Sequence, residues 1–205
     1  HHHYRSVHPR LIAFSNAHFY ENNLIAFPAY PTENPIEVID ADGCYENRIN
    51  KKEAQFVADL ITEKVNQNNF DFGVVAFSQT QLNAILDRLS ETVLDQLMNR
   101  EEQLLIQSLE NVQGEQCDHL IISLGYGYNP EHKFNFQFGP LNQVNGHRRL
   151  NVLFSRARKK ITFVRSVAAK DFTISDNIGV DLLRKWMLLI EQEDKTSLSF
   201  PFALE

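Results

Sequence analysis

Residues 72–77 read Phe-Gly-Val-Val-Ala-Phe, and the polar sequence Ser-Gln-Thr-Gln follows at residues 78–81. A short, continuous apolar run of this kind is typical of a strand that is buried on both faces of a sheet. The residues that follow, 79–98, are expected to form one long helix. A buried strand that leads directly into a helix is the repeating unit of α/β proteins, so this stretch favours a parallel sheet covered by helices.

The same alternation continues on both sides of this stretch. Further strands are expected over residues 36–40, 104–108, 119–124 and 160–166. Further helices are expected over residues 9–24, 51–65 and 178–190. Because apolar strands alternate with helices, the sequence predicts a three-layer α/β fold in which helices cover both faces of a mainly parallel sheet. Functional sites in such sheets gather at the carboxyl ends of the strands.

The length of the chain bounds its domain organisation. A chain of 205 residues with 43% hydrophobic content fits one core, so we expect a single domain over residues 1–205. The Gly- and aromatic-rich residues 125–146 are expected to form an insertion loop. The chain opens with three histidines and no Met, and residues 1–3 are open to two interpretations, a purification tag or native sequence that includes His3. Residues 204–205 resemble a cloning scar, and we interpret the chain as a piece of a longer protein.

Cysteine usage, hydropathy and charge limit the class of protein. Cys44 and Cys117 lie far apart without a C-x-x-C pattern, which favours a reducing, cytoplasmic location. No apolar run approaches the roughly 18 residues of a membrane-spanning helix, so no membrane partner is expected. The net charge is -6, yet residues 119–170 hold nine Lys or Arg residues and one acid, Glu131. This segregation predicts one anion-binding face on an otherwise acidic protein.

The most basic stretch, residues 148–160, reads Arg-Arg-Leu-Asn-Val-Leu-Phe-Ser-Arg-Ala-Arg-Lys-Lys. Its apolar residues recur at helical spacing, so a helix is expected throughout. Arg149 and Arg156 are seven residues apart, which on a helix places them on one face about 10 Å apart. Guanidinium groups bind phosphate oxygens through two parallel hydrogen bonds, so we interpret this face as a phosphate site. The last three cations are interpreted as solvated residues at the negative end of the helix: Arg158, Lys159 and Lys160.

The same stretch resembles the last conserved motif of superfamily 1 helicases, in the branch that includes the RNA-surveillance helicases. The usual form of that motif is R-R-x-N-V-A-x-T-R-A-R, and Ser155 replaces its Thr. In the family, the Arg of T-R-A reaches the γ-phosphate of ATP. The resemblance implies that Arg156 takes this catalytic role and that Arg149 supports the nucleotide site.

A second match covers residues 109–118, Leu-Glu-Asn-Val-Gln-Gly-Glu-Gln-Cys-Asp, followed by His-Leu-Ile-Ile-Ser. It resembles the family motif Q-G-x-E-x-D-x-I-I-x-S, which links the nucleotide to the nucleic-acid track. A glycine at Gly114 lets the backbone turn tightly and approach a ligand that a side chain would obstruct. The resemblance implies that Gln113, Gly114 and Gln116 line the ribose side of the nucleotide and that Asn111 touches the strand. Gln116 stands where the family has Glu, and its amide can still bond a hydroxyl group.

A third match lies at residues 3–9, His-Tyr-Arg-Ser-Val-His-Pro. It resembles the family segment Q-Y-R-x-H-P. The resemblance implies that Tyr4 lies near the base and that Arg5 acts as an arginine finger, which stabilises charge on the transferred phosphoryl group.

Two shorter matches lie between these motifs. Residues 74–81 resemble the strand-to-helix turn that touches the nucleic-acid backbone, with Ser78 and Gln81 as candidate contacts. Asn50 with the dipeptide at 53–54 resembles a helix start of the form N-x-x-E-A. Polar residues that only cap helices would give the same two patterns.

The resemblance as a whole implies a RecA-like fold of the P-loop NTPase type and the second, C-terminal motor domain of an ATP-dependent DNA or RNA helicase or translocase. The chain lacks the phosphate-binding pattern G-x-x-x-x-G-K followed by Ser or Thr. In superfamily 1 motors, a first RecA-like domain supplies that pattern and the Mg²⁺ ligands. We therefore expect no metal ligands in this chain. The expected partners are single-stranded DNA or RNA and the missing first domain, and the isolated chain is expected to hydrolyse no ATP.

Two alternatives remain open from the sequence. One is a module that binds nucleic acid or protein without hydrolysis. The other is a metal-dependent nuclease, in which Asp118 and the E-x-K pattern formed by Glu131 and Lys133 hold Mg²⁺ and activate water.

Overall fold

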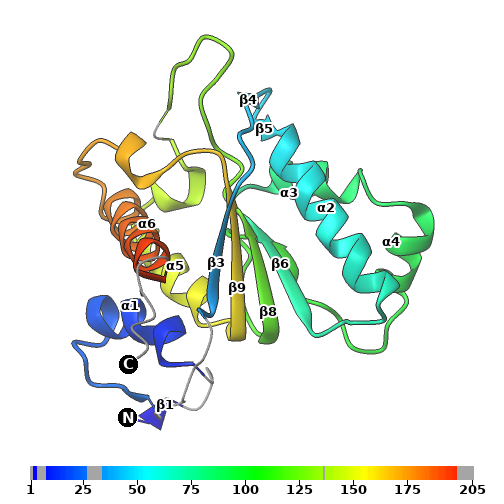
Figure 1. The fold of residues 1–205 in the computed structure, drawn as a ribbon, viewed down its shortest axis with the longest axis horizontal. Coiled ribbons are helices and arrows are strands. Elements are labelled where there is room, and N and C mark those ends of the chain that lie inside the picture. The colour runs from blue at the N-terminus through cyan, green and yellow to red at the C-terminus, as the bar shows by residue number, and fades with distance from the viewer. Residues whose placement is uncertain (1, 4–7, 27–33, 136, 198–205) are drawn as a thin grey trace, which may run out of the picture.

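The computed structural model describes residues 2–3, 8–26, 34–135 and 137–197. Within them, five strands form one sheet in the order β3-β9-β8-β6-β7, and every neighbouring pair is parallel (Figure 1). The strands are β3 (Ile36–Asp40), β6 (Phe72–Ala76), β7 (Ile106–Ser108), β8 (Cys117–Ser123) and β9 (Ala157–Arg165). The expected parallel sheet is confirmed.

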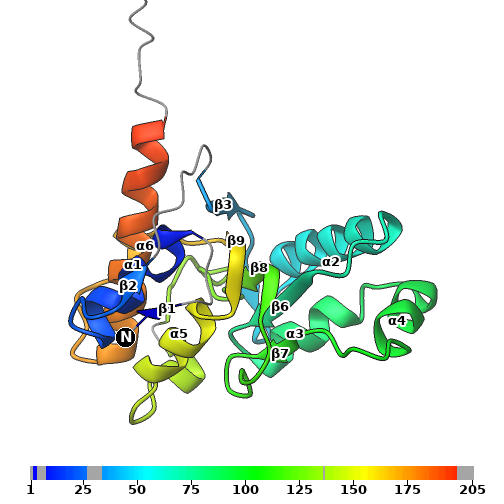
Figure 2. The same ribbon diagram turned by 90° about the horizontal axis from the view of Figure 1, so that it is seen from below.

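Helices cover both faces of this sheet (Figures 1 and 2). One face carries α1 (Pro9–Phe19), α5 (His147–Phe154) and α6 (Ile178–Ser197). The other face carries α2 (Lys51–Asn66), α3 (Gln79–Leu86) and α4 (Glu91–Met98). Each side has its own apolar core, one that includes Phe154 and Trp186 and one that includes Ile61 and Ile85. The three-layer α/β arrangement is therefore confirmed.

Smaller elements complete the described chain. Two short strands, β1 (His2–His3) and β2 (Ile25–Ala26), pair in parallel. A hairpin is formed by β4 (Tyr45–Glu46) and β5 (Ile49–Asn50). Short 3₁₀ helices lie at η1 (Gly139–Leu141) and η2 (Ala169–Asp171). No helix in the described part of the chain is long and apolar enough to cross a lipid bilayer.

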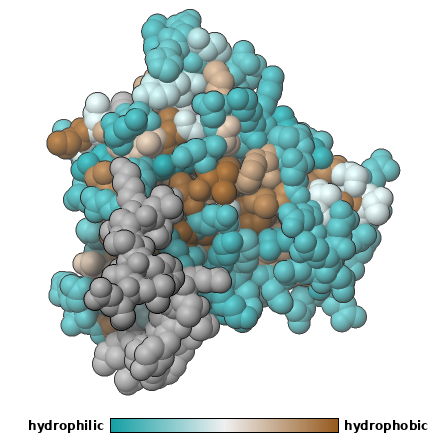
Figure 3. All heavy atoms as spheres, in the orientation of Figure 1, coloured by the Kyte–Doolittle hydropathy of each residue, from teal (hydrophilic) through white to brown (hydrophobic). Residues whose placement is uncertain are grey.

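Strand β6, which lies between β8 and β7, shows why the apolar run forms an interior strand of the sheet. All five of its residues are buried. A Cβ atom on Gly73 would lie 2.9 Å from the sulfur of Cys117, so the glycine allows β6 to pack closely against β8. Strand β3 forms one edge of the sheet. It lies at the centre of the face drawn in Figure 3, where hydrophobic residues are surrounded by hydrophilic ones.

The prediction of one helix over residues 79–98 is wrong, because the structure has two helices there. The segment 87–90 turns after α3, and Ser90 adopts an extended conformation with ψ 155°. Its side chain accepts a hydrogen bond from the backbone N–H of Val93 at 3.3 Å and so begins α4. A serine cap inside the apolar pattern therefore begins a second helix after α3 has ended at Leu86.

The prediction of one helix over residues 148–160 is also wrong. Helix α5 ends at Phe154, and strand β9 begins at Ala157, which pairs with Cys117 of β8. Pairing with a central strand and burial of Ile161 and Phe163 outweighed the helical spacing. Arg149 and Arg156 therefore do not share a helix face.

The first helix is shorter than expected. It ends at Phe19 rather than at residue 24, and Glu21 and Asn22 follow with positive φ angles of 51° and 60°. The side chain of Asn16 donates to the carbonyl of Leu24 at 3.0 Å and accepts from its N–H at 2.9 Å, which holds the chain in this turn.

Candidate functional site

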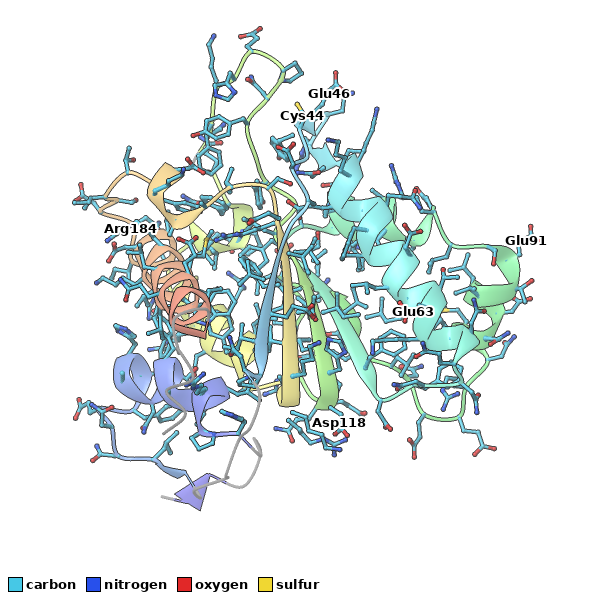
Figure 4. The ribbon with its side chains drawn as sticks, in the orientation of Figure 1. Cys44, Glu46, Glu63, Glu91, Asp118 and Arg184 are labelled. Atoms are coloured by element: carbon cyan, nitrogen blue, oxygen red, sulfur yellow. The ribbon has the colours of Figure 1, made fainter. Side chains whose placement is uncertain are left out.

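Because all five strands are parallel, the expected site residues divide between two ends of the sheet. Ser78 follows β6 and Asn111 follows β7 at the carboxyl end. Gln116 precedes β8 and Arg156 precedes β9 at the amino end, where Figure 4 also labels Asp118. The segment 109–116 runs from the first end to the second, so it connects the two groups of residues.

Arg156 forms the centre of the group at the amino end. It is 8% exposed and lies in the junction between α5 and β9. Its Nε donates to the carbonyl of Val152 at 3.0 Å, one terminal nitrogen donates to the Ser155 hydroxyl at 3.0 Å, and the other donates to the carbonyl of Gly114. These three hydrogen bonds orient the guanidinium group at the junction.

A second contact joins the same two segments. Nε2 of Gln116 donates to the carbonyl of Ser155 at 3.1 Å. In addition, the N–H of Cys117 donates to the carbonyl of Arg156 at 3.0 Å. The two motifs that the sequence analysis singled out at residues 113–116 and 155–156 therefore form one surface.

Gly114 has a backbone conformation that favours glycine, with a φ angle of 82°. A Cβ atom placed there would meet no protein atom within 4 Å. The glycine is therefore explained by the backbone turn and not by close approach of other protein atoms. The neighbouring Gln113 is exposed, and its N–H donates to the side chain of Gln107 at 3.3 Å. Open space beside this turn leaves room for a ligand.

Arg149 lies outside the Arg156 group. It donates to the carbonyl of Pro140 at 2.8 Å and to the side chain of Gln143 at 3.1 Å. It is therefore held by the loop that precedes α5. The expected pairing of the two arginines on one face is wrong, since Arg156 lies beyond the end of the helix.

At the carboxyl end, Ser78 and Asn111 are open to solvent to different degrees. Half-buried Ser78 caps α3 and accepts from the N–H of Gln81 at 3.1 Å, and its hydroxyl lies 3.1 Å from that of Thr80. Asn111 is exposed, and its side chain donates to the Ser108 hydroxyl at 3.3 Å. Both side chains lie where an extended single strand of nucleic acid could contact them.

Gln81 does not lie on this surface. Its side chain has 0% exposure. It accepts from the N–H of Asn50 at 2.8 Å and donates to the carbonyl of Asn50 and the hydroxyl of Ser123, both at 3.1 Å. The expectation that Gln81 touches nucleic acid is wrong, because both polar atoms of its side chain are hydrogen-bonded inside the protein.

Sequence reasoning missed Glu53 as part of the same buried polar cluster. Its carboxyl group accepts from the N–H of Gly125 at 2.7 Å, from the Ser123 hydroxyl at 3.1 Å and from the Asn50 side chain at 3.2 Å. Burial raises the pKa of Glu53 to about 8, against the opposing effect of the Gly125 hydrogen bond. The N-x-x-E pattern indicated a helix cap, but the burial of the glutamate had no local signal.

The arrangement of Asp118, Glu131 and Lys133 excludes the nuclease site built from them. Asp118, at the start of β8, is paired with Arg158 at 2.7 Å and Lys159 at 2.6 Å, and the Lys159 hydrogen bond lowers its pKa. Glu131 and Lys133 pair with each other at 2.8 Å in the loop that follows the other end of β8. Within the described ranges, no group of three or more His, Cys, Asp or Glu residues could hold a metal ion.

Two expected site residues, Tyr4 and Arg5, lie outside the residues that the structure describes. Their roles near the base and as an arginine finger stay predictions.

Comparison with known proteins shows the family to which the chain belongs. The sequence profile of the AAA domain family matches residues 1–167. An uncharacterized ATP-dependent helicase of Mycoplasma genitalium is 29% identical over 204 residues, which cover 92% of this chain and 18% of that protein. The homologue from Mycoplasma pneumoniae gives the same identity and coverage. The chain thus spans less than a fifth of the length of these curated relatives.

Among solved structures, the C-terminal domain of a possible DNA helicase from Lactobacillus plantarum WCFS1 matches with a TM-score of 0.45 and 15% sequence identity. The match covers 79% of this chain and 86% of that chain.

Proposed function

Because the chain belongs to the AAA domain family, we propose that it forms the second motor domain of an ATP-dependent DNA or RNA helicase or translocase. The two curated relatives are both named as ATP-dependent helicases, which supports this proposal. The resemblance of three separated motifs to superfamily 1 helicases supports it further. In this role the chain supplies arginines to ATP that a first RecA-like domain holds, together with part of the single-strand track.

The observation that carries the proposal is the joint surface of Gly114, Gln116 and Arg156. Three hydrogen bonds orient Arg156 beside the Gly114 turn, and a guanidinium group fixed in this way can stabilise charge on a phosphoryl group. The amide of Gln116 can bond a ribose hydroxyl beside it. Bound ATP supplies the phosphoryl group that is hydrolysed, and its Mg²⁺ ligands are assigned to the first domain.

The connection between the two ends of the sheet fits a motor. The segment 109–116 carries Asn111 near the carboxyl end and Gly114 near the amino end, where the Gly114 carbonyl accepts from Arg156. If the nucleotide moved this segment at Gly114, the movement would therefore also displace Asn111, the proposed contact with single-stranded nucleic acid. Closing and opening of the two motor domains around ATP would then shift the grip on a single strand.

The proposal is tested by ATP hydrolysis in the full-length protein, measured with and without single-stranded DNA and single-stranded RNA. We expect that single-stranded DNA, single-stranded RNA or both stimulate ATP hydrolysis. We also expect the protein to move along the nucleic acid or to separate a duplex. Strand binding without any hydrolysis would contradict the motor assignment and favour a binding module.

A further inference from the structure

The tip of the β4–β5 hairpin has an unusual residue for its backbone conformation. The two residues of the turn, Asn47 and Arg48, both have positive φ angles, 52° and 66°. Two successive left-handed residues form the hairpin turn for which the sequence Asn-Gly is preferred, because glycine adopts this conformation without steric cost. An arginine at the second position is therefore strained relative to glycine.

The surroundings of Arg48 leave its charge available. The residue is exposed, and in the described part of the chain its guanidinium group makes no ion pair or hydrogen bond. Three lysines around the hairpin each have an oxygen partner: Lys51 with Glu46 at 4.0 Å, Lys52 with the carbonyl of Asp42 at 2.9 Å, and Lys133 with Glu131 at 2.8 Å. Arg48 therefore differs from these neighbouring cations in presenting an uncompensated charge to solvent.

The hairpin is fixed on two sides, so the position of Arg48 is defined. The Thr80 hydroxyl, in the first turn of α3, donates to the carbonyl of Arg48 at 3.2 Å. On the other side, the N–H of Tyr45 donates to the carbonyl of Tyr128 at 2.8 Å. Figure 4 shows this hairpin, through its labelled Cys44 and Glu46, at the opposite end of the molecule from Asp118. Arg48 thus lies beside the helix start that carries Ser78.

We propose that Arg48 is a phosphate-contacting residue of the single-strand track, and that it binds the backbone of single-stranded nucleic acid next to Ser78. The chemistry fits, since a guanidinium fork can donate two parallel hydrogen bonds to phosphate oxygens. The bonded hydroxyl groups of Ser78 and Thr80, 3.1 Å apart, add polar surface beside it. This assignment rests on the proposed motor function and adds a contact that none of the sequence motifs contains.

The test compares Arg48→Gly with Asn47→Gly in the full-length protein. Both substitutions place glycine at a left-handed position of the same turn, but only the first removes the guanidinium group. Binding to a fluorescent, unstructured oligo-dT and to its oligo-rU counterpart is measured at several salt concentrations, together with thermal unfolding. We expect Arg48→Gly to unfold at the same or a higher temperature than the unsubstituted protein, and yet to bind several-fold more weakly.

The salt dependence gives the sharper result. Loss of one phosphate contact reduces the slope of log K against log salt by about 0.7 for a single strand, so this decrease is expected for Arg48→Gly and not for Asn47→Gly. Equal affinities and slopes for the two variants would overturn the assignment and leave the motor function standing. Absence of strand binding by the unsubstituted protein would overturn both.

Discussion

The carboxyl group of Glu53 has no exposed surface, yet it joins the start of α2 to the end of β8. Its partners are Asn50 at the start of α2, and Ser123 and Gly125 at the end of β8. Gln81 extends the same cluster to α3. These bonds fix the carboxyl end of the sheet, from which Ser78 and the β4–β5 hairpin project.

The pKa of Glu53 leads to a prediction on stability. Burial raises this pKa from 4.5 to about 8, so between these values the unfolded chain releases a proton that the folded chain keeps. Folded stability from this group is therefore present at low pH and is lost as the pH rises through about 8. Glu53→Gln removes the titrating group, and we expect its free energy of unfolding to fall less than that of the unsubstituted protein between those pH values.

The measurement is urea unfolding of both proteins across this pH range. Parallel pH dependence of the two proteins would show that Glu53 is already ionised in the folded state and would contradict the prediction.

Single residues could be read from the sequence where their chemistry does not depend on burial. Arg156, Gly114 and Gln116 were singled out by motif, and the structure brings them together. Gln81 and Glu53 could not be assigned in this way, because polar residues in the first turn of a helix are usually exposed. Only the packing of α2 and α3 against the end of β8 shows that both are buried.

The serine caps of α3 and α4 allow the effect of a cap on folding stability to be separated from an effect on nucleic-acid binding. Ser78 begins α3 and Ser90 begins α4, each by accepting an N–H three residues later. Ser90→Ala is expected to lower the free energy of unfolding by about 1 kcal/mol and to leave strand binding unchanged. Ser78→Ala is expected to cost a similar amount and also to weaken strand binding.

Chemical denaturation and oligonucleotide binding of both variants check this prediction. If Ser78→Ala bound the strand as tightly as Ser90→Ala, Ser78 would be a helix cap and not a strand contact.

The positions of the elements were largely predictable from apolar runs, whereas the extents of three expected helices were not. Strand β6 was predicted from the apolar run at residues 72–77, and helix α2 from its apolar stripe. The continuous helix expected over residues 148–160 was wrong, because pairing of β9 with β8 decides the conformation of residues 157–160. Local spacing contains no information about which strand will pair with such a segment.

For the whole molecule, the charge distribution is less one-sided than the sequence suggested. The basic residues between 119 and 170 include several that the fold pairs with acids from outside that segment: Arg158 and Lys159 with Asp118, Lys160 with Glu37, and Arg165 with Asp40 and Glu191. The proposed contacts with anions therefore depend on a few arginines and not on a broad basic face.

The proposed division of labour between two domains predicts the behaviour of the chain by itself. In this proposal the 205-residue chain supplies only the arginines of the ATP site, and its sequence lacks the phosphate-binding pattern that the first domain would provide. We therefore expect no phosphate release when it is incubated with ATP, Mg²⁺ and oligo-dT. Turnover at an ordinary enzymatic rate would contradict this division.

The most direct test of the motor assignment is strand-stimulated ATP hydrolysis by the full-length protein carrying Arg156→Ala. We expect kcat to fall on the order of a thousandfold while oligonucleotide binding is retained, because the arginine acts on the phosphoryl group. Arg158→Ala, two residues away and paired with Asp118, is the matched control and should hydrolyse ATP nearly as the unsubstituted protein does. Unchanged turnover in Arg156→Ala would contradict the assignment of this residue and of the nucleotide surface built around it.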